Sequence, residues 1–238
     1  MPPIAREKTD YQGLKMIHSW LGTLATPDDV VFIKDHRKQA SDIYSNEVFP
    51  DRSGDLSGAG LQIEVQFYQN KFVPPVMAVY WPEDNSLAST PIMDHKDGYF
   101  TEKLIVGSKG SKMSLRNSDD VGHTIYVKDE KQKVKWQLNY MPPGSEFEQD
   151  LFWQDDVFVE LKCRLHLYMS SWVGSLSTVY HKIIKFEQEN YVRTQMVKYP
   201  ENFTELKIWL PRYQLISTRI EVGEEQMFEL KQGDTLRG

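Results

Sequence analysis

The chain has 238 residues, a formal net charge of −6 from 28 Lys and Arg against 34 Asp and Glu, and a single cysteine. This length suits one large domain or two small ones, and the acidic balance argues against a general binder of nucleic acid or anionic membranes, which would use a basic face. One cysteine excludes an internal disulfide, and no apolar run approaches the roughly 20 residues of a membrane-spanning helix.

The N-terminal region carries a helical pattern of apolar residues. Within residues 10–24 this pattern consists of Leu14, Ile17, Trp20, Leu21 and Leu24. A weaker helical stretch runs from Val31 to Tyr44. We therefore expect residues 1–58 to form a helical N-terminal extension, which could pair two copies of the chain. The first residues lack the basic and then apolar pattern of a signal peptide. Two interpretations stay open: a cytoplasmic protein, or an exported protein whose signal peptide has been removed.

After the turn-rich segment 50–60, the apolar period changes to two. Leu61, Ile63 and Val65 alternate with polar residues, which is typical of a half-buried strand. Further short strands are expected at 76–81, 104–106, 113–117, 123–127, 159–163 and from residue 172. Many short strands separated by Gly and Pro predict a mainly β fold with a β-sandwich over residues 59–183. Residues 184–238 predict a small β-module or extra strands.

The single cysteine lies in a run that suggests metal binding. Cys163, His166 and Met169 follow one another at intervals of three residues. A thiolate, an imidazole and a thioether are ligands of copper in electron-transfer sites, which also need a second imidazole. His123 is the candidate, because it follows a polar loop and precedes an apolar strand. We predict one copper ion per chain, bound by His123, Cys163, His166 and Met169. Singly these residues are weak signals, since a lone cysteine is most often a small buried hydrophobe.

This pattern resembles that of a cupredoxin. The loop from Cys163 to Met169 has the short spacing of amicyanin-type proteins, and the segment 117–123 resembles the region before the first copper ligand in methylamine-utilisation-like cupredoxins. The resemblance implies a Greek-key cupredoxin β-sandwich, a type 1 copper centre and a role for Asn117 in bracing the ligand loops. Residues 206–211 resemble the small transthyretin-like β-module that often follows such domains. Family members are mostly exported, which implies a periplasmic or exported protein.

Two positions depart from the family pattern. Thr124 stands where the family often has an asparagine whose amide ties the two ligand loops together, and Leu167 stands where it often has a proline. Either change could alter the rigidity or colour of the site, but neither removes a ligand.

The leading functional hypothesis is one-electron transfer by a protein that is not an enzyme. The edge of His166, flanked by Leu165, Leu167 and Tyr168, would form an apolar docking patch for a redox partner protein. A copper-holding or copper-delivery protein without a redox partner would use the same ligands. A structural or sensory cupredoxin-like module would bind no copper.

Catalytic schemes find little support in the sequence. The chain has no Gly-x-Ser-x-Gly, phosphate-binding glycine loop or His-Glu-x-x-His motif. A nucleophilic pair of Cys163 and His166 is conceivable, but the tight spacing suits metal ligation better. A multicopper oxidase would need further histidine-rich sites, and the other histidines are scattered. His95 is the best of them for an additional contact with the site, although we expect it in an exposed loop.

Overall fold

The computed structural model describes residues 29–35, 60–67, 73–82, 90–129, 133–186, 192–198, 204–220 and 224–231. These residues form seventeen β-strands and no helix. In chain order the strands are β1 Val30–Asp35, β2 Gly60–Gln66, β3 Val76–Tyr80, β4 Ile92–Lys96, β5 Tyr99–Phe100, β6 Leu104–Gly107, β7 Lys112–Asn117, β8 His123–Asp129, β9 Val134–Met141, β10 Glu146–Asp150, β11 Val157–Cys163, β12 Ser170–Ser175, β13 His181–Lys185, β14 Val192–Lys198, β15 Glu205–Trp209, β16 Ile216–Arg219 and β17 Glu225–Glu229. The described part of the chain contains no helix long and apolar enough to span a membrane.

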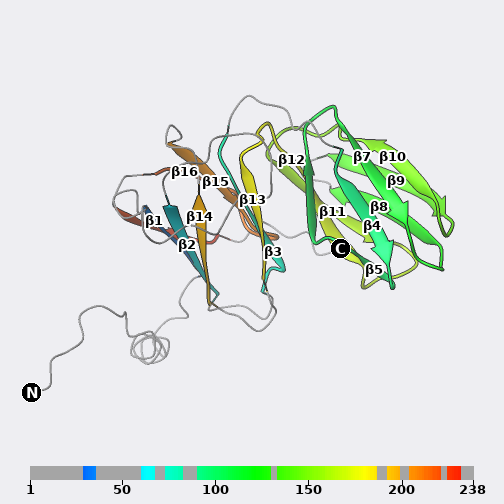
Figure 1. Cartoon of the computed structure of the whole chain (residues 1–238), viewed down its shortest axis with the longest axis horizontal. Helices are drawn as coiled ribbons and strands as arrows, with labels where there is room; N and C mark the ends of the chain where they lie inside the picture. The colour runs from blue at the N-terminus through cyan, green and yellow to red at the C-terminus, as the bar shows by residue number, and fades with distance from the viewer. Residues whose placement is uncertain are drawn as a thin grey trace, which may run out of the picture.

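Strands β4 to β12 pair only among themselves and form two sheets. One sheet has the order β10-β7-β4-β5 and the other the order β6-β12-β11-β8-β9. Neighbours are antiparallel except β4 with β7 and β6 with β12, which are parallel. The two sheets share one apolar core, which includes Met93, Leu115, Val127, Leu161 and Val173. We call this pair of sheets the central sandwich; it is coloured green to yellow in Figure 1.

The remaining strands are β1 to β3, which precede the central sandwich in the sequence, and β13 to β17, which follow it. They form the sheets β14-β2-β1-β17 and β13-β3-β15-β16. These sheets share a second apolar core, which includes Val31, Ile63, Val79 and Ile208. Figure 1 shows the blue and cyan strands of the first part of the chain beside the orange and red strands of its last part. We call this pair of sheets the flanking sandwich.

The sheets group the chain differently from the division that we predicted at residues 59 and 183. Strands β2 and β3 lie inside the predicted 59–183 unit, yet they pair with β14, β13 and β15. Residue 183 falls within β13. Sequence alternation identifies a strand and its inward face but does not name the partner strand, so the pattern alone could not show this grouping. We propose that residues 92–175 form a domain inserted between β3 and β13 of the flanking sandwich.

The predicted helical stretch from Val31 to Tyr44 is wrong where the structure describes it. Residues 30–35 are strand β1, which pairs with β2 on one side and β17 on the other. Val31 and Ile33 are buried while Phe32 between them is half-buried, so the period is two. Branching at Cβ further favours a strand here. The predicted helix over residues 10–24, the rest of the 1–58 extension and pairing of two copies through it lie outside the described residues.

The two sandwiches meet through an aromatic interface. The ring of Trp209 on β15 stacks on Phe158 of β11, with centroids 4.1 Å apart and planes 9° apart, and contacts Trp172 of β12 at 6.3 Å. At the edge of this cluster, the Tyr80 hydroxyl donates a 2.8 Å hydrogen bond to Asp156, whose other carboxylate oxygen lies 2.7 Å from Lys207 Nζ. The interface therefore anchors β11 and β12, which flank the loop that carries the predicted ligands.

Candidate metal centre

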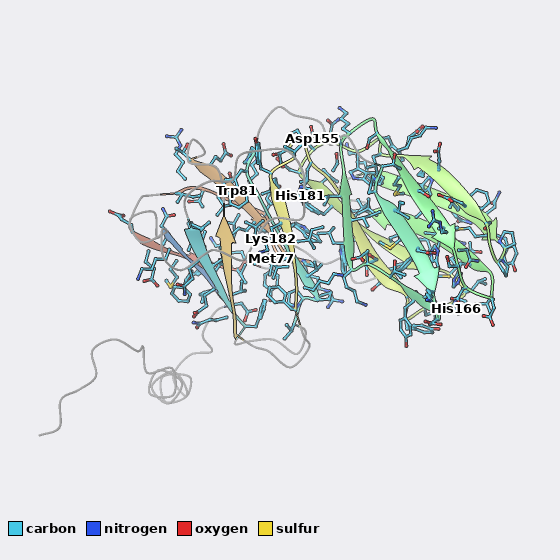
Figure 2. All side chains as sticks on the ribbon, viewed as in Figure 1. Met77, Trp81, Asp155, His166, His181 and Lys182 are labelled. Atoms are coloured by element: carbon cyan, nitrogen blue, oxygen red, sulfur yellow. The ribbon has the colours of Figure 1, made fainter. Side chains whose placement is uncertain are left out.

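The side chains of His123, Cys163 and His166 converge at one end of the central sandwich. His123 is the first residue of β8 and Cys163 is the last residue of its neighbour β11, while His166 lies in the loop to β12. Cys163 Sγ lies 3.7 Å from His123 Nδ1 and 3.6 Å from His166 Nδ1, and the two Nδ1 atoms are 3.2 Å apart. In Figure 2, His166 lies at the end of the central sandwich that is far from His181 and Met77 of the flanking sandwich. Three of the four predicted ligands are thus brought together.

The spacing of these three donor atoms fits a metal ion. Metal bonds of about 2.0 Å to nitrogen and about 2.3 Å to sulfur would hold such atoms roughly 3.3–3.8 Å apart at angles between tetrahedral and trigonal. The two observed distances from sulfur to nitrogen, 3.6 and 3.7 Å, fall in this range, and the 3.2 Å between the two Nδ1 atoms is just below its lower end. Among the described residues, no other group of three His, Cys, Asp or Glu donors could hold a metal ion. One thiolate with two imidazoles is a trigonal set that copper accepts, so the residues fit copper.

The centre is shielded from water on all but one side. Cys163 and His123 are buried, whereas His166 is half-buried at the surface. Leu165, Leu167 and Tyr168 of the same loop are exposed around it. His166 is therefore the side chain that links the buried donors to the surface of the protein.

Asp119 orients the ring of His123. Its Oδ2 lies 3.2 Å from His123 Nε2 and also accepts a 2.7 Å hydrogen bond from the Gly98 N–H. Because a carboxylate accepts, we assign the ring proton to Nε2, which leaves the lone pair of Nδ1 for a metal. Burial raises the pKa of Asp119, but the hydrogen bonds from Gly98 and His123 outweigh it and leave this pKa below its usual value. Burial lowers the pKa of His123, and Asp119 opposes this shift. Both shifts favour the forms that a metal site requires.

Asn117 braces the first ligand loop. It is fully buried at the end of β7, where Nδ2 donates to the carbonyls of Val121 at 2.9 Å and Met141 at 3.1 Å. Its Oδ1 accepts a 3.0 Å hydrogen bond from the Asp119 N–H. These bonds hold the loop that carries Asp119 and His123 against the end of β9.

The two ligand loops are tied together through the main chain. The Arg164 N–H donates a 2.9 Å hydrogen bond to the carbonyl of Thr124. In the cupredoxins that the sequence resembles, an asparagine side chain often links the loops from the position of Thr124. In this chain the main-chain bond links the two loops directly.

Met169 closes the second ligand loop. Its N–H donates to the His166 carbonyl at 2.9 Å, and its carbonyl accepts from the Cys163 N–H at 3.4 Å. The side chain is buried in the same apolar core as Cys163. Its sulfur as an axial ligand stays a prediction.

Two residues near the centre were missed or misjudged from the sequence. Asp119 belongs to the segment 117–123 that carried the resemblance, but we predicted no role for it, although its spacing of four residues from His123 was a signal. His95 was expected in an exposed loop, and this expectation is wrong: it lies in β4, is fully buried, and stacks on His123 with centroids 4.9 Å apart and planes 20° apart. The signal was alternation, since Met93 and His95 point to the same face of a strand. Burial lowers the pKa of His95 to about 4, although its hydrogen bond to the Arg116 carbonyl acts in the opposite direction.

No family model matches the chain, and no curated protein matches it. Among solved structures, a purple cupredoxin from Nitrosopumilus maritimus is 14% identical, with 36% of this chain and 98% of that chain covered and a TM-score of 0.31. A reduced tyrosine-for-tryptophan mutant of amicyanin is 10% identical, with 41% and 97% covered and a TM-score of 0.33. A Cu(I) methionine-to-alanine mutant of amicyanin is 10% identical, with the same coverage and a TM-score of 0.32.

The central sandwich has the features that the resemblance to cupredoxins predicted. Two mixed sheets pack face to face, and a buried His-Cys-His cluster lies at one end, on paired strands and the loop that follows them.

Proposed function

We propose that this protein binds one copper ion through His123, Cys163 and His166 and carries single electrons, as a carrier rather than an enzyme. The observation that supports this most directly is the triangle of one sulfur and two Nδ1 atoms, 3.2–3.7 Å apart, in a buried setting. This ligand set holds copper in electron-transfer sites, with a weak axial thioether, and we propose Met169 for that position. Bound copper would supply the Cu(II)/Cu(I) change.

The protein's own residues would keep the ligands in place during that change. His123 and Cys163 lie on paired strands, and Asp119 and Asn117 fix the loop that leads to His123. Ligands held by strands and by outer hydrogen bonds keep their orientation better than ligands on free loops. A site that moves little on reduction and oxidation exchanges electrons quickly.

We also propose that a redox partner protein docks around His166. Leu165, Leu167 and Tyr168 are 56%, 87% and 62% exposed beside this half-buried ligand. An apolar patch around a ligand edge excludes water from a short-lived contact and shortens the path between the two redox centres. By analogy with exported cupredoxins, we propose a periplasmic or exported location.

Copper titration of the purified full chain tests the proposal. We expect one equivalent of copper(II) to bind and to give an intense thiolate-to-copper band in the visible. The variant Cys163→Ser should lose this band, whereas Met169→Leu should keep the colour and raise the reduction potential. Wild-type protein with neither a visible band nor bound copper would overturn the proposal.

Oxidation kinetics separate an electron carrier from a copper-holding protein. We expect the Cu(I) protein to be oxidised rapidly by a small inorganic oxidant such as ferricyanide, with return of the band. A Cu(I) form that stays colourless and releases its copper to a chelator before it is oxidised would instead indicate copper storage or delivery.

A further inference from the structure

The ring of His95 lies against the ring of the predicted copper ligand His123. The two imidazoles stack with centroids 4.9 Å apart and planes 20° apart. Nδ1 of His95 lies 2.5 Å from the carbonyl oxygen of Arg116, and the ring of Phe100 lies 4.8 Å away. Because a carbonyl only accepts, we assign the proton of His95 to Nδ1. The orientation of this ring is therefore fixed by Arg116 and Phe100, independently of His123.

Histidine is an unfavourable choice at this position if it only fills the core. His95 is fully buried, and its Nε2 has no hydrogen-bond partner among the residues that the structure describes. A buried polar atom without a partner costs folding free energy. Phenylalanine would fill a similar volume without this cost. A buried group of this kind in a native protein asks for an explanation beyond packing.

The hairpin that carries His95 also contacts the first ligand loop. Strands β4 and β5 are joined by a tight turn in which Asp97 and Gly98 have φ values of 53° and 76°. Besides the bond from Gly98 to Asp119, the carbonyl of His95 accepts a 3.0 Å hydrogen bond from the Ser118 N–H. The carboxylate of Asp94 accepts a 2.8 Å bond from the Ser118 hydroxyl.

The same hairpin reaches the second ligand loop. A β-carbon added to Gly98 would lie 3.0 Å from the hydroxyl oxygen of Tyr168. The ring of Tyr99 lies 5.4 Å from the ring of Tyr168. Tyr168 stands between His166 and Met169, so the hairpin contacts both loops that supply predicted ligands.

We infer that His95 is a positioning residue of the metal centre and that the β4–β5 hairpin clamps both ligand loops. The stack on one face and the Asp119 hydrogen bond at Nε2 together prevent the His123 ring from rotating about its Cβ–Cγ bond. Nδ1 of His123 then keeps its direction towards Cys163 and His166, whether or not a metal is bound. The inference rests on the proposed function in that copper is taken as the metal. The orientation of the His123 ring does not depend on the proposed function.

Two substitutions of His95 separate a positioning role from core packing. His95→Leu removes the stack, and we expect it to weaken copper binding roughly 10-fold, the size of effect seen for residues that orient ligands, and to shift the visible band. His95→Phe keeps an aromatic ring and removes the unpartnered nitrogen. We expect this variant to retain the band and the affinity, and to unfold at or above the wild-type temperature.

Measurement on the metal-free protein tests the clamp without copper. In wild-type protein, the Nε2 proton of His123 should exchange slowly with solvent and show a hydrogen-bonded NMR shift. In His95→Leu its exchange should be roughly tenfold faster, as expected when a local opening becomes easier. The matched control is His181→Leu, which removes a half-buried histidine of the flanking sandwich and should leave this proton unchanged.

The outcomes are distinguishable. If His95→Leu leaves the exchange rate, the band and the affinity at wild-type values, the positioning role is wrong and His95 only fills the core. If His95→Leu does not fold, His95→Gln serves, because it keeps a donor for the Arg116 carbonyl and loses the ring. A wild-type protein that binds no copper would sink the proposed function, while the proton exchange of His123 would still decide whether His95 holds its ring.

Discussion

The central and the flanking sandwich share an architecture but differ in what they bury. Each consists of two sheets packed face to face around an apolar core. In the central sandwich, His95, Asn117 and His123 are fully buried at one end. The flanking sandwich also buries two carboxylate side chains, Asp29 and Glu64, and Asp29 accepts a 2.6 Å hydrogen bond from the Tyr213 hydroxyl. Buried polar groups cost stability unless they are paired. Among the described residues, the central sandwich alone groups thiol and imidazole donors closely enough to hold a metal ion, which distinguishes the sandwich with the candidate site from the sandwich beside it.

The largest expected effect comes from cutting the contact between the two sandwiches. Trp209→Ala should lower the free energy of unfolding by about 3–5 kcal/mol, the usual cost of removing a buried tryptophan, because Trp209 packs on both Phe158 and Trp172. Urea unfolding measures the loss. The visible copper band should stay unchanged, since no ligand contacts this side chain. Met227→Ala, at a 61% exposed position, is the control and should change neither quantity. Loss of the band in folded Trp209→Ala protein would show that the metal centre of the central sandwich depends on its contact with the flanking sandwich.

Removing the brace of the first ligand loop should have the next largest effect. Asn117→Ala leaves the carbonyls of Val121 and Met141 without their donor. The bond to Met141 is buried and the bond to Val121 is partly buried, and an unsatisfied buried group costs about 1–3 kcal/mol. We expect a loss of about 2–3 kcal/mol in urea unfolding, together with a weaker visible band. Asn139→Ala on the exposed side of β9 is the matched control. Equal stability of the two variants would contradict a bracing role.

A smaller effect is expected from neutralising the charge behind His123. Asp119→Asn should lower copper affinity by about 10- to 100-fold, as measured by competition with a chelator. It should also raise the reduction potential, because the negative charge favours Cu(II) over Cu(I) and its removal reverses that preference. Asp120→Asn, at the exposed neighbouring position, should leave both values near wild type. A potential that does not move, or that falls, would argue against the assigned hydrogen bond.

The smallest expected effect is a pH dependence in the flanking sandwich. Burial lowers the pKa of His181 on β13, while a hydrogen bond to the Val179 backbone opposes the shift. When the pKa of a histidine is lower in the folded protein than its unfolded value of about 6.5, the unfolded state takes up the proton first as the pH falls. The free energy of unfolding is therefore highest above pH 6.5 and decreases below it. Below pH 6.5 the metal-free protein should lose stability less steeply in His181→Gln than in wild type, by less than the one-proton limit of about 1.4 kcal/mol per pH unit. If the free energy of unfolding falls equally steeply with pH in the two proteins, the pKa of His181 is not lowered.

The sequence predicted strands better than it predicted their partners. Leu61, Ile63 and Val65 identified β2 by alternation, and all three side chains are buried. Nothing local indicated that β2 pairs with β1 and β14, because pairing between distant strands depends on the whole fold. The same limit explains why the sequence pattern did not suggest the inserted domain that we propose for residues 92–175.

The site was predictable where ligand chemistry restricts the residue type. A thiolate and imidazoles are few in this chain, so Cys163, His166 and His123 could be selected by type and spacing. Asp119 and His95 are not predicted ligands, so ligand chemistry does not select them, and the sequence does not show which residue each one lies against. Their positions became clear only when the hairpin of β4 and β5 was placed against the ligand loops.

The pairing of β3 with β13 has a consequence for the order of folding. Tyr80 and His181 are directly opposite each other, and the Trp81 N–H donates to the Tyr180 carbonyl, so the whole central sandwich is the loop of one antiparallel hairpin. Closing so long a loop as a random chain costs conformational entropy before any contact forms. A folded insert brings its two ends together and removes that cost. We therefore expect pulse-labelling hydrogen exchange to detect protection of β8 and β11 before that of β3 and β13. The part of the chain with the candidate metal centre would then be the template on which the flanking sandwich assembles.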